Sequence, residues 1–295
     1  MNSPTRTTIV VGVDGSTSAL HAALWAADEA AQRHRPMRLV YANNEFAFGT
    51  TGGLAPPQSF YDSMQAAGVQ LLADAESAIR KVHPDLDISV DLQTSAPVPS
   101  LLDQTQDAFL MVLGSRGNGG FRGILVGSTA VALVAHGDCP VAVIRGATED
   151  APPPTEGPVV VGVDGSPTSD AAIATAFDEA TWRGAELVAV HAWPDYASDR
   201  ARSLGFSEGS EQAEKELLAE RLAGWKEKYP DVDVRRVVTQ GRPVKRLLEL
   251  AAGAQLVVVG SRGNGGFTGM MLGSTSQALI RHATCPLMVV RPVES

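Results

Sequence analysis

The stretch Val10-Val11-Gly12-Val13-Asp14-Gly15-Ser16 occurs a second time, unchanged, as Val160-Val161-Gly162-Val163-Asp164-Gly165-Ser166. Each copy is a short β-branched run followed by Asp-Gly-Ser, a pattern typical of a buried strand that ends in a turn. The copies begin 150 positions apart in a chain of 295 residues. Since an ordinary domain has about 150 residues, the repeat predicts two domains of similar fold.

A glycine-rich stretch is also repeated. Gly114-Ser115-Arg116-Gly117-Asn118-Gly119-Gly120-Phe121 returns as Gly260-Ser261-Arg262-Gly263-Asn264-Gly265-Gly266-Phe267, and each copy continues to Gly-Ser-Thr at positions 127–129 and 273–275. These copies are 146 positions apart, so the second half is four residues shorter, and the change falls in the connection between residues 42 and 71. Backbone N–H groups in such a stretch, together with its arginine, can bind phosphate. We therefore expect two anion sites.

Apolar periodicity predicts alternating strands and helices. In the first half, strands are expected at residues 8–13, 37–42, 88–92, 109–113 and 141–144, and helices at 18–33, 61–82, from 97 onward and at 127–135. This order favours an α/β fold with two doubly wound, Rossmann-like domains, each a five-stranded parallel sheet flanked by helices. The domains are expected at residues 1–146 and 158–295, joined by a proline-rich linker at 147–157.

The composition argues against several classes of partner. The formal net charge is −9 and no run of lysine or arginine occurs, so neither nucleic acid nor an anionic membrane surface is expected. No apolar run reaches the roughly 18 residues of a membrane span, and the N-terminus is polar, which predicts a cytoplasmic protein. Cys139 and Cys285 occupy matching His-x-x-Cys-Pro segments, and we expect small buried residues beside a strand rather than metal ligands.

The repeated motifs fall where a doubly wound sheet binds its ligands, at the carboxyl ends of strands beside the switch in strand order. Asp14 and Asp164 are expected to end the first strand of each half. The spacing Gly-x2-Gly-x9-Gly-Ser ends at a predicted helix start. There, free N–H groups and the hydroxyls of Ser128 and Ser274 can donate to phosphate.

Each of these residues also has a purely structural explanation. The two aspartates precede Gly-Ser and a helix, so they are candidate caps or turn formers. The glycines could serve only a tight crossover, although a crossover alone does not require an arginine and a Ser-Thr pair at a helix start. Tyr41 and His191, beside the predicted ligand position, fit packing or loop roles better than ligand contacts.

The first-strand Val-Gly-Val-Asp-Gly-Ser, the long-spaced glycine loop and the Cys-Pro final strand together resemble the universal stress protein family, in its tandem form and its ATP-binding branch. The resemblance implies that adenine lies against the ends of the first, second and fourth strands, that the aspartate approaches the ribose or a metal-bound phosphate, and that ribose and phosphates follow the loop. In the first half these positions are Gly12, Asp14, Ala42, Leu113, Gly114, Arg116, Gly117, Gly127, Ser128 and Thr129. In the second half they are Gly162, Asp164, Ala192, Val259, Gly260, Arg262, Gly263, Gly273, Ser274 and Thr275.

The resemblance also implies a function: a nucleotide-dependent regulator or sensor in stress or dormancy adaptation, with ATP as cofactor, alone or with magnesium. Alternatives are a slow ATPase or nucleotidyl-transfer enzyme on the same fold, and a binder of AMP or cyclic AMP. A binding protein is favoured over a dedicated enzyme, because the repeated histidines, His136 and His282, lie away from the predicted loop and no Gly-Lys-[Ser/Thr] is present. Residues 205–209 read Gly-Phe-Ser-Glu-Gly, as in a nucleophile elbow, but a polar stretch precedes them where an apolar strand is required.

The duplication bears on assembly as well. Because an exposed apolar edge strand invites association, the two halves are expected to pair within the chain as a pseudo-dimer, through the last strands at 141–144 and 287–290. A homodimer and a protein partner are further candidates.

Overall fold

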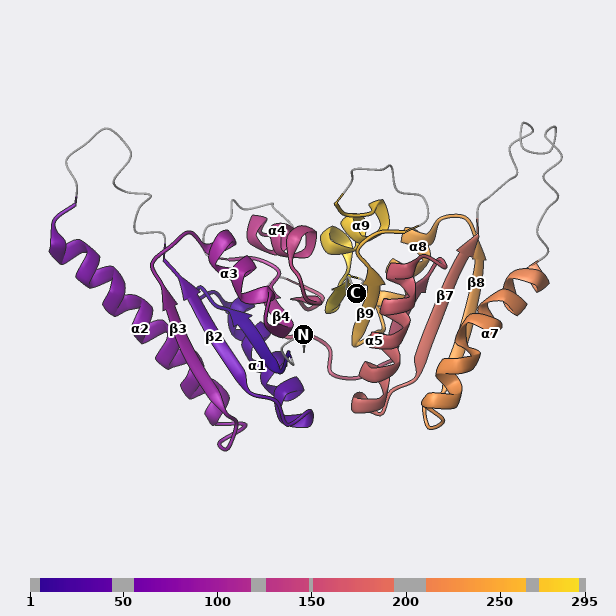
Figure 1. Ribbon diagram of the computed structural model, residues 1–295, viewed down its shortest axis with the longest axis horizontal. Helices are drawn as coiled ribbons and strands as arrows, with labels where there is room; N and C mark the ends of the chain where they lie inside the picture. Colours follow the sequence, from indigo (N-terminus) through magenta and orange to yellow (C-terminus); the bar gives the residue numbers. More distant parts are fainter. Residues whose placement is uncertain are drawn as a thin grey trace, which may run out of the picture. The chain divides into compact units, whose positions relative to one another are not determined.

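The computed structural model describes residues 6–43, 56–117, 126–148, 151–193, 211–263 and 271–291. It divides the chain into two compact units, residues 1–153 and 154–295, and each unit contains one of the repeats (Figure 1). The middle of each glycine-rich loop, residues 118–125 and 264–270, lies outside the described residues, and so does the Gly-Phe-Ser-Glu-Gly segment at 205–209.

The first unit is a five-stranded parallel sheet with helices in its connections. Its elements are β1 (Thr8–Gly12), α1 (Thr17–Gln32), β2 (Met37–Ala42), α2 (Gln58–Arg80), β3 (Ile88–Gln93), α3 (Pro97–Thr105), β4 (Ala108–Gly114), α4 (Ser128–His136) and β5 (Val141–Ile144). The strand order is β3-β2-β1-β4-β5, and the neighbouring strands are parallel. The order changes direction between β1 and β4, which places the switch point at the ends of these two strands.

The second unit repeats this plan. Its elements are β6 (Val159–Val163), α5 (Pro167–Arg183), β7 (Leu187–Trp193), α7 (Glu211–Lys228), β8 (Val234–Gln240), α8 (Pro243–Ala251), β9 (Leu256–Gly260), α9 (Ser274–His282) and β10 (Leu287–Val290). The strand order is β8-β7-β6-β9-β10, again with parallel pairs. The corresponding switch point lies between β6 and β9.

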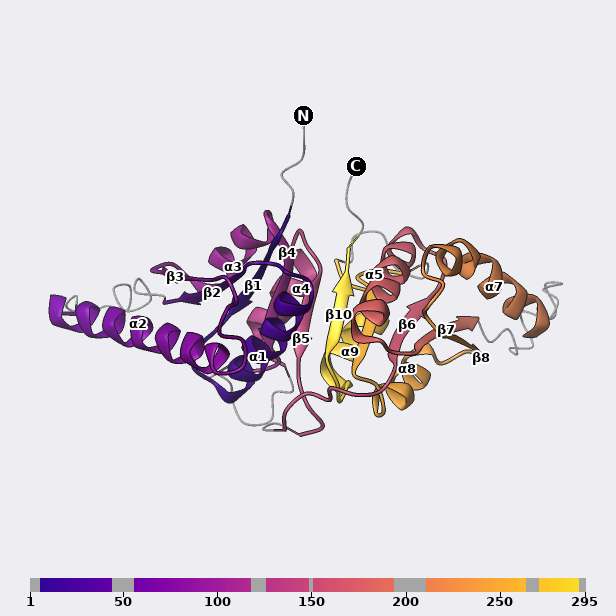
Figure 2. The same ribbon diagram turned by 90° about the horizontal axis from the view of Figure 1, so that it is seen from below.

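Helices cover both faces of each sheet. In the first unit, Figure 2 shows α1 and α2 on one side of the strands and α3 on the other. Burial on two faces explains why the central strands are continuous apolar runs: Ile9, Val10 and Val11 of β1 are at most 1% exposed, whereas Val90 of the outer strand β3 is exposed. The α/β fold with two doubly wound domains, predicted from the sequence, is therefore confirmed. Among the described helices, none combines the length and the apolar character that crossing a membrane requires.

Several element boundaries differ from those expected. Helix α2 begins at Gln58 and ends at Arg80 instead of spanning 61–82, and α4 begins one residue later than expected because Gly127 is its extended N-cap. Strand β1 ends at Gly12 and β6 at Val163, so the prediction that Asp14 and Asp164 end these strands was wrong by two residues and by one residue. Both aspartates instead lie in the turn that follows, where a backbone N–H donates to each side chain.

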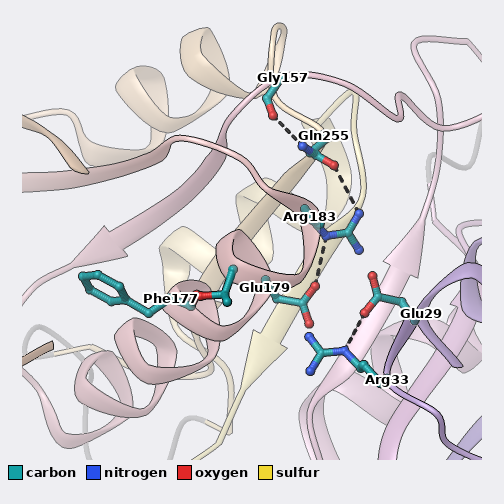
Figure 3. A network of polar contacts seen from close by, with 8 residues as sticks. Glu29, Arg33, Gly157, Phe177, Glu179, Arg183 and Gln255 are labelled. Carbon is teal, nitrogen blue, oxygen red and sulfur yellow. Dashed lines mark hydrogen bonds and ion pairs between the residues drawn. The ribbon is translucent and has the colours of Figure 1, made fainter. Parts of the chain in front are cut away.

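Each unit buries an ion pair in the last turns of the helix after its first strand (Figure 3). In α1, Arg33 Nε donates to Glu29 at 2.9 Å, and in α5, Arg183 Nε donates to Glu179 at 3.1 Å. Both carboxylates are nearly inaccessible, with 2% and 3% of the side chain exposed. Arg183 also donates to Gln255 Oε1 at 3.3 Å, which ties the end of α5 to the start of β9. Because charges removed from water need such partners, these pairs fix the ends of both helices.

The two cysteines are free and buried, as the sequence predicted. Each lies just before the last strand of its unit, Cys139 before β5 and Cys285 before β10. Burial raises the pKa of the Cys139 thiol from 9.0 to about 12. That thiol is therefore protonated and poorly nucleophilic at neutral pH.

Candidate functional site

The predicted binding residues of each unit meet at the carboxyl edge of its sheet, around the switch point. In the first unit, Gly12, Ala42 and Gly114 end strands β1, β2 and β4. Leu113 precedes Gly114, Arg116 and Gly117 follow it, and Gly127, Ser128 and Thr129 form the start of α4. The second unit places Gly162, Ala192, Val259, Gly260, Arg262, Gly263, Gly273, Ser274 and Thr275 at the equivalent positions of β6, β7, β9 and α9.

A tight turn holds the aspartate of each unit. Asp14 Oδ1 accepts a hydrogen bond from Ser16 N–H at 3.0 Å, and Asp164 Oδ1 accepts from Ser166 N–H at the same distance. The glycine between them has a left-handed backbone, with φ of 82° at Gly15 and 77° at position 165, a conformation that favours glycine. Each aspartate is therefore a turn former, one of the structural roles expected for it, and uses its Oδ1 atom for this purpose.

The other carboxylate oxygen faces the glycine-rich loop. A methyl group built on Gly117 would lie 2.1 Å from Asp14 Oδ2, and one built on Gly263 would lie 2.1 Å from Asp164 Oδ2. In each unit the carboxylate oxygen therefore occupies the space that the Cβ atom of any other residue would fill at Gly117 or Gly263. The same contact in two copies shows that the first-strand turn and the loop form one structure.

The described ends of the loop are held together as well. Gly127 N–H donates to Ser115 O at 2.8 Å, and Gly273 N–H donates to the carbonyl of Ser261 at 2.8 Å. This bond brings the start of α4 near the first residues of the loop, since a methyl group built on Gly127 would lie 3.8 Å from the Cα atom of Arg116. Arginine, loop amides and helix start are thus gathered at one place.

The start of α4 and that of α9 are suited to anions. Gly127 and Gly273 are extended N-caps, and no side chain among the described residues caps either helix. The next residues, Ser128 and Ser274, are exposed. Uncapped N–H groups and the positive end of a helix dipole favour anions, which is the chemistry that a phosphate site requires.

Apolar side chains close the floor of the site. A methyl group on Gly12 would lie 2.6 Å from Leu113 Cδ2 and 3.2 Å from Leu101 Cδ1, so the glycine lets these leucines cover the end of β1. Leu113 is 5% exposed and Val259, its counterpart, is 4% exposed. Their side chains consequently belong to the core, and only their backbone can border a ligand.

One hydroxyl side chain in each unit joins the turn region to the loop, a contact that was not predicted from the sequence. Ser16 caps α1 by accepting from Ala19 N–H at 3.1 Å, and its hydroxyl donates to Arg116 O at 3.3 Å. In the second unit, Thr168 Oγ1 donates to Arg262 O at 2.5 Å. The capping signal, a serine between a strand and a helix, was available in the sequence, but the bond to a residue about 100 positions away was not.

The residues beside the predicted adenine position differ between the units. In the first, Tyr41 packs against Gly68 of α2, where a methyl group would lie 2.9 Å from the ring. In the second, His191 Nδ1 lies 2.8 Å from Val163 O, and its Nε2 lies 3.0 Å from a carboxylate oxygen of Glu214. Both side chains are held by protein contacts, in agreement with the packing role expected for Tyr41 and His191.

The acidic residues limit what the site can do with metals. A carboxylate disfavours a phosphate beside it, unless it binds a sugar hydroxyl or a cation that the phosphate shares. Magnesium is commonly held by one or two carboxylates together with phosphates, so Asp14 and Asp164 fit that role. Within the described ranges, no cluster of three or more histidine, cysteine, aspartate or glutamate side chains could hold a metal by itself.

A shallow hollow on the surface lies away from this site. It runs along α8 and is lined by Arg242, Val244, Lys245, Leu248 and Glu249. It is open to solvent and contains none of the predicted binding residues. The strand ends differ from this hollow in carrying the repeated aspartate turn and the described ends of the glycine-rich loop.

Comparison with known proteins gives one consistent result. The model of the universal stress protein family matches residues 5–145 and 157–291. Universal stress protein Rv2005c of Mycobacterium tuberculosis is 44% identical over 286 residues, covering 96% of each chain. Universal stress protein Rv2623 of the same organism is 40% identical over 287 residues, also covering 96% of each. The crystal structure of a universal stress protein from Archaeoglobus fulgidus superposes with a TM-score of 0.69 at 19% identity, covering 99% of this chain and 100% of that one.

Proposed function

Because this chain belongs to the universal stress protein family, we propose that it is an ATP-binding regulator in stress or dormancy adaptation, with one nucleotide site in each half. The proposal is supported above all by one repeated contact: a carboxylate oxygen of Asp14 lies close to Gly117, and one of Asp164 lies close to Gly263. A carboxylate, a glycine loop and an uncapped helix start are held together twice by the same contacts, and their chemistry suits ribose and phosphates.

Different groups of the site bind different parts of the nucleotide. The first amides of α4 and the hydroxyls of Ser128 and Thr129 donate to phosphate oxygens, and Arg116 offsets part of their charge. Asp14 Oδ2 accepts from a ribose hydroxyl or shares a magnesium ion with the phosphates. The adenine ring of the nucleotide lies against the backbone at Gly12, Ala42 and Leu113. The equivalent residues of the second half act in the same way.

Binding without catalysis fits the geometry best. A hydrolytic enzyme needs a base within hydrogen-bond reach of the attacking water. His136 ends α4, eight residues after Ser128, so it lies about 12 Å along the helix axis from the proposed phosphate position. His282 has the same place in α9. Neither repeated histidine can reach a nucleotide at the helix start.

Calorimetric titration of the purified full chain with ATP, ADP, AMP and cyclic AMP tests the proposal. We expect about two ATP molecules per chain, and mass spectrometry of ligand released from freshly purified protein identifies the nucleotide bound in the cell. Failure to bind any adenine nucleotide would refute it. Steady ATP turnover that disappears in the Gly117→Ala, Gly263→Ala double variant would replace the regulator by an ATPase, and preference for AMP or cyclic AMP would change the ligand.

Location and assembly belong to the same proposal. We propose a cytoplasmic protein, which fractionation of the producing cells tests. We also propose that the two halves associate within the chain and that two chains can form a dimer. Sedimentation velocity measures both: two independently tumbling halves would give a larger frictional ratio than a single compact particle, and a monomeric mass at all concentrations would exclude the dimer.

A further inference from the structure

The two halves carry different residues at one position that faces the aspartate turn. Arg221 of α7 corresponds to Ala75 of α2 at the offset of 146 positions that relates the two helices. The guanidinium of Arg221 lies directly against Gly165, since a methyl group on that glycine would overlap its terminal atoms. Gly165 is half-buried, whereas its counterpart Gly15 is exposed. The second half therefore has a cation beside the Asp164 turn that the first half lacks.

The geometry of α7 explains how the arginine reaches this turn. Leu218 and Leu222 are 1% and 3% exposed and hold the inner face of the helix on the sheet, and Arg221 lies between them in sequence on the same face. Because α7 runs opposite to the parallel strands, it begins at their carboxyl edge. Side chains of a helix lean toward its N-terminus, so a long side chain on this face extends toward the strand ends.

The environment of Arg221 suggests a ligand rather than a structural ion pair. Its Nε atom is buried and has no hydrogen-bond partner among the residues that the structure describes. Glu214, two turns earlier in α7, has a carboxylate oxygen 3.0 Å from His191 Nε2. The carboxylate of Asp164, next to Gly165 in the chain, accepts from Ser166 N–H at 3.0 Å. An arginine guanidinium offers a planar set of donors that matches phosphate geometry. A buried donor without a partner is unfavourable unless something outside the described residues satisfies it.

We propose that Arg221 is a specificity-determining residue of the second site, which makes that site prefer ligands with more negative charge than the first site does. The inference rests on the proposed nucleotide-binding function and goes beyond it, because it assigns unequal selectivity to two sites whose repeated motifs are identical. A second cation beside the site, such as the guanidinium that lies against Gly165, raises affinity for a nucleoside triphosphate more than for the uncharged nucleoside. The first site, with Ala75, lacks this contribution.

The full chain carrying Gly117→Ala has its first site closed, so calorimetry on this variant measures binding at the second site alone. ATP, AMP and adenosine are the ligands, and Arg221→Met and Arg221→Lys are the variants. We expect Arg221→Met to weaken ATP binding about tenfold and adenosine binding less than twofold, and Arg221→Lys to retain most of the ATP affinity. The ATP affinity lost in Arg221→Met should also shrink as salt concentration rises.

The reciprocal variant provides an independent measurement. Ala75→Arg in a chain carrying Gly263→Ala should raise the preference of the first site for ATP over adenosine. If Arg221→Met lowers ATP and adenosine affinity equally, or lowers neither, the role of Arg221 in specificity is refuted while the two nucleotide sites stand. If the unaltered chain binds none of the three ligands, the proposed function fails and the inference fails with it.

Discussion

Replacing Gly117 by alanine tests the central contact of the site. The added methyl group would lie 2.1 Å from Asp14 Oδ2, whereas Cβ atoms essentially never approach a heavy atom closer than 3.0 Å. The carboxylate must therefore move by about 1 Å. Asp14 Oδ1 accepts from Ser16 N–H at 3.0 Å, so the movement strains or breaks that bond. A hydrogen bond to a charged group contributes about 1.5–3 kcal/mol, which bounds the expected fall in the free energy of unfolding.

Isothermal titration with ATP measures the effect on binding. We expect Gly117→Ala to reduce the stoichiometry from about two to about one, because the displaced carboxylate occupies the place of the ribose or cation. Gly263→Ala should remove the other site, since its added methyl group would lie 2.1 Å from Asp164 Oδ2. The double variant should bind no ATP while retaining the circular dichroism spectrum of the unaltered protein.

Gly224→Ala is the matched control. Gly224 lies within α7, and a methyl group there would meet no atom of the described part of the chain within 4 Å. Alanine at a helical glycine should raise the free energy of unfolding by about 0.5–1 kcal/mol and leave ATP binding unchanged. A Gly117→Ala protein that still binds two ATP molecules with unchanged affinity would show that the position of the carboxylate does not matter for the ligand, and the reasoning would be wrong.

Three further predictions concern other parts of the molecule. Among the described residues, a methyl group on Gly127 would have only ordinary contacts, the nearest at 3.7 Å. Gly127→Ala should therefore melt at the temperature of the unaltered protein but bind ATP more weakly, as differential scanning fluorimetry and calorimetry can measure. Burial raises the pKa of Cys139 from 9.0 to about 12, so the fold stabilises the protonated thiol. The free energy of unfolding should therefore fall as pH rises from about 9 toward 12. The fall should be smaller in Cys139→Ala, which lacks the thiol. Glu179→Ala leaves the Arg183 charge buried and should lower the free energy of unfolding by about 3–5 kcal/mol in urea titration.

These three predictions have internal controls. If Gly127→Ala melts lower, the loop itself has been disturbed and the loss of affinity says nothing of backbone contact with the ligand. An alkaline stability profile that is identical with and without Cys139 would assign the effect to other groups. Lys215→Ala breaks an exposed pair with Glu211 and should change stability by less than about 0.5 kcal/mol; an equal effect of Glu179→Ala would contradict the argument from burial.

Much of the fold could be predicted from local patterns. The central strands are buried on both faces, so they appear in the sequence as short apolar runs such as residues 109–113, and the helices between them have their own periodicity. The repeat of Asp-Gly-Ser and of the glycine loop located both candidate sites at the ends of β1 and β4 and of their counterparts. Boundaries were less accurate, because N-caps such as Gly127 depend on backbone angles that composition does not fix.

The contacts that build the site could not be predicted in the same way. Asp14 and Gly117 are about 100 positions apart, and their approach follows from two loops that meet only when β1 pairs with β4. The reach of Arg221 over Gly165 depends on the direction in which a long side chain leaves α7. In the sequence, that arginine is one of many charged residues on a helix, and nothing nearby marks it as a site residue.

One backbone hydrogen bond joins the described ends of each glycine-rich loop, from Gly127 N–H to Ser115 O and from Gly273 N–H to Ser261 O. A loop whose ends are fixed can be lengthened between them at small entropic cost, about 0.6 kcal/mol for each doubling of its length. The bond from Gly127 N–H to Ser115 O therefore sets the distance between Arg116 and the start of α4 independently of the length of chain that joins them. A relative with a longer or shorter connection between these two residues could keep the same helix start beside the same arginine.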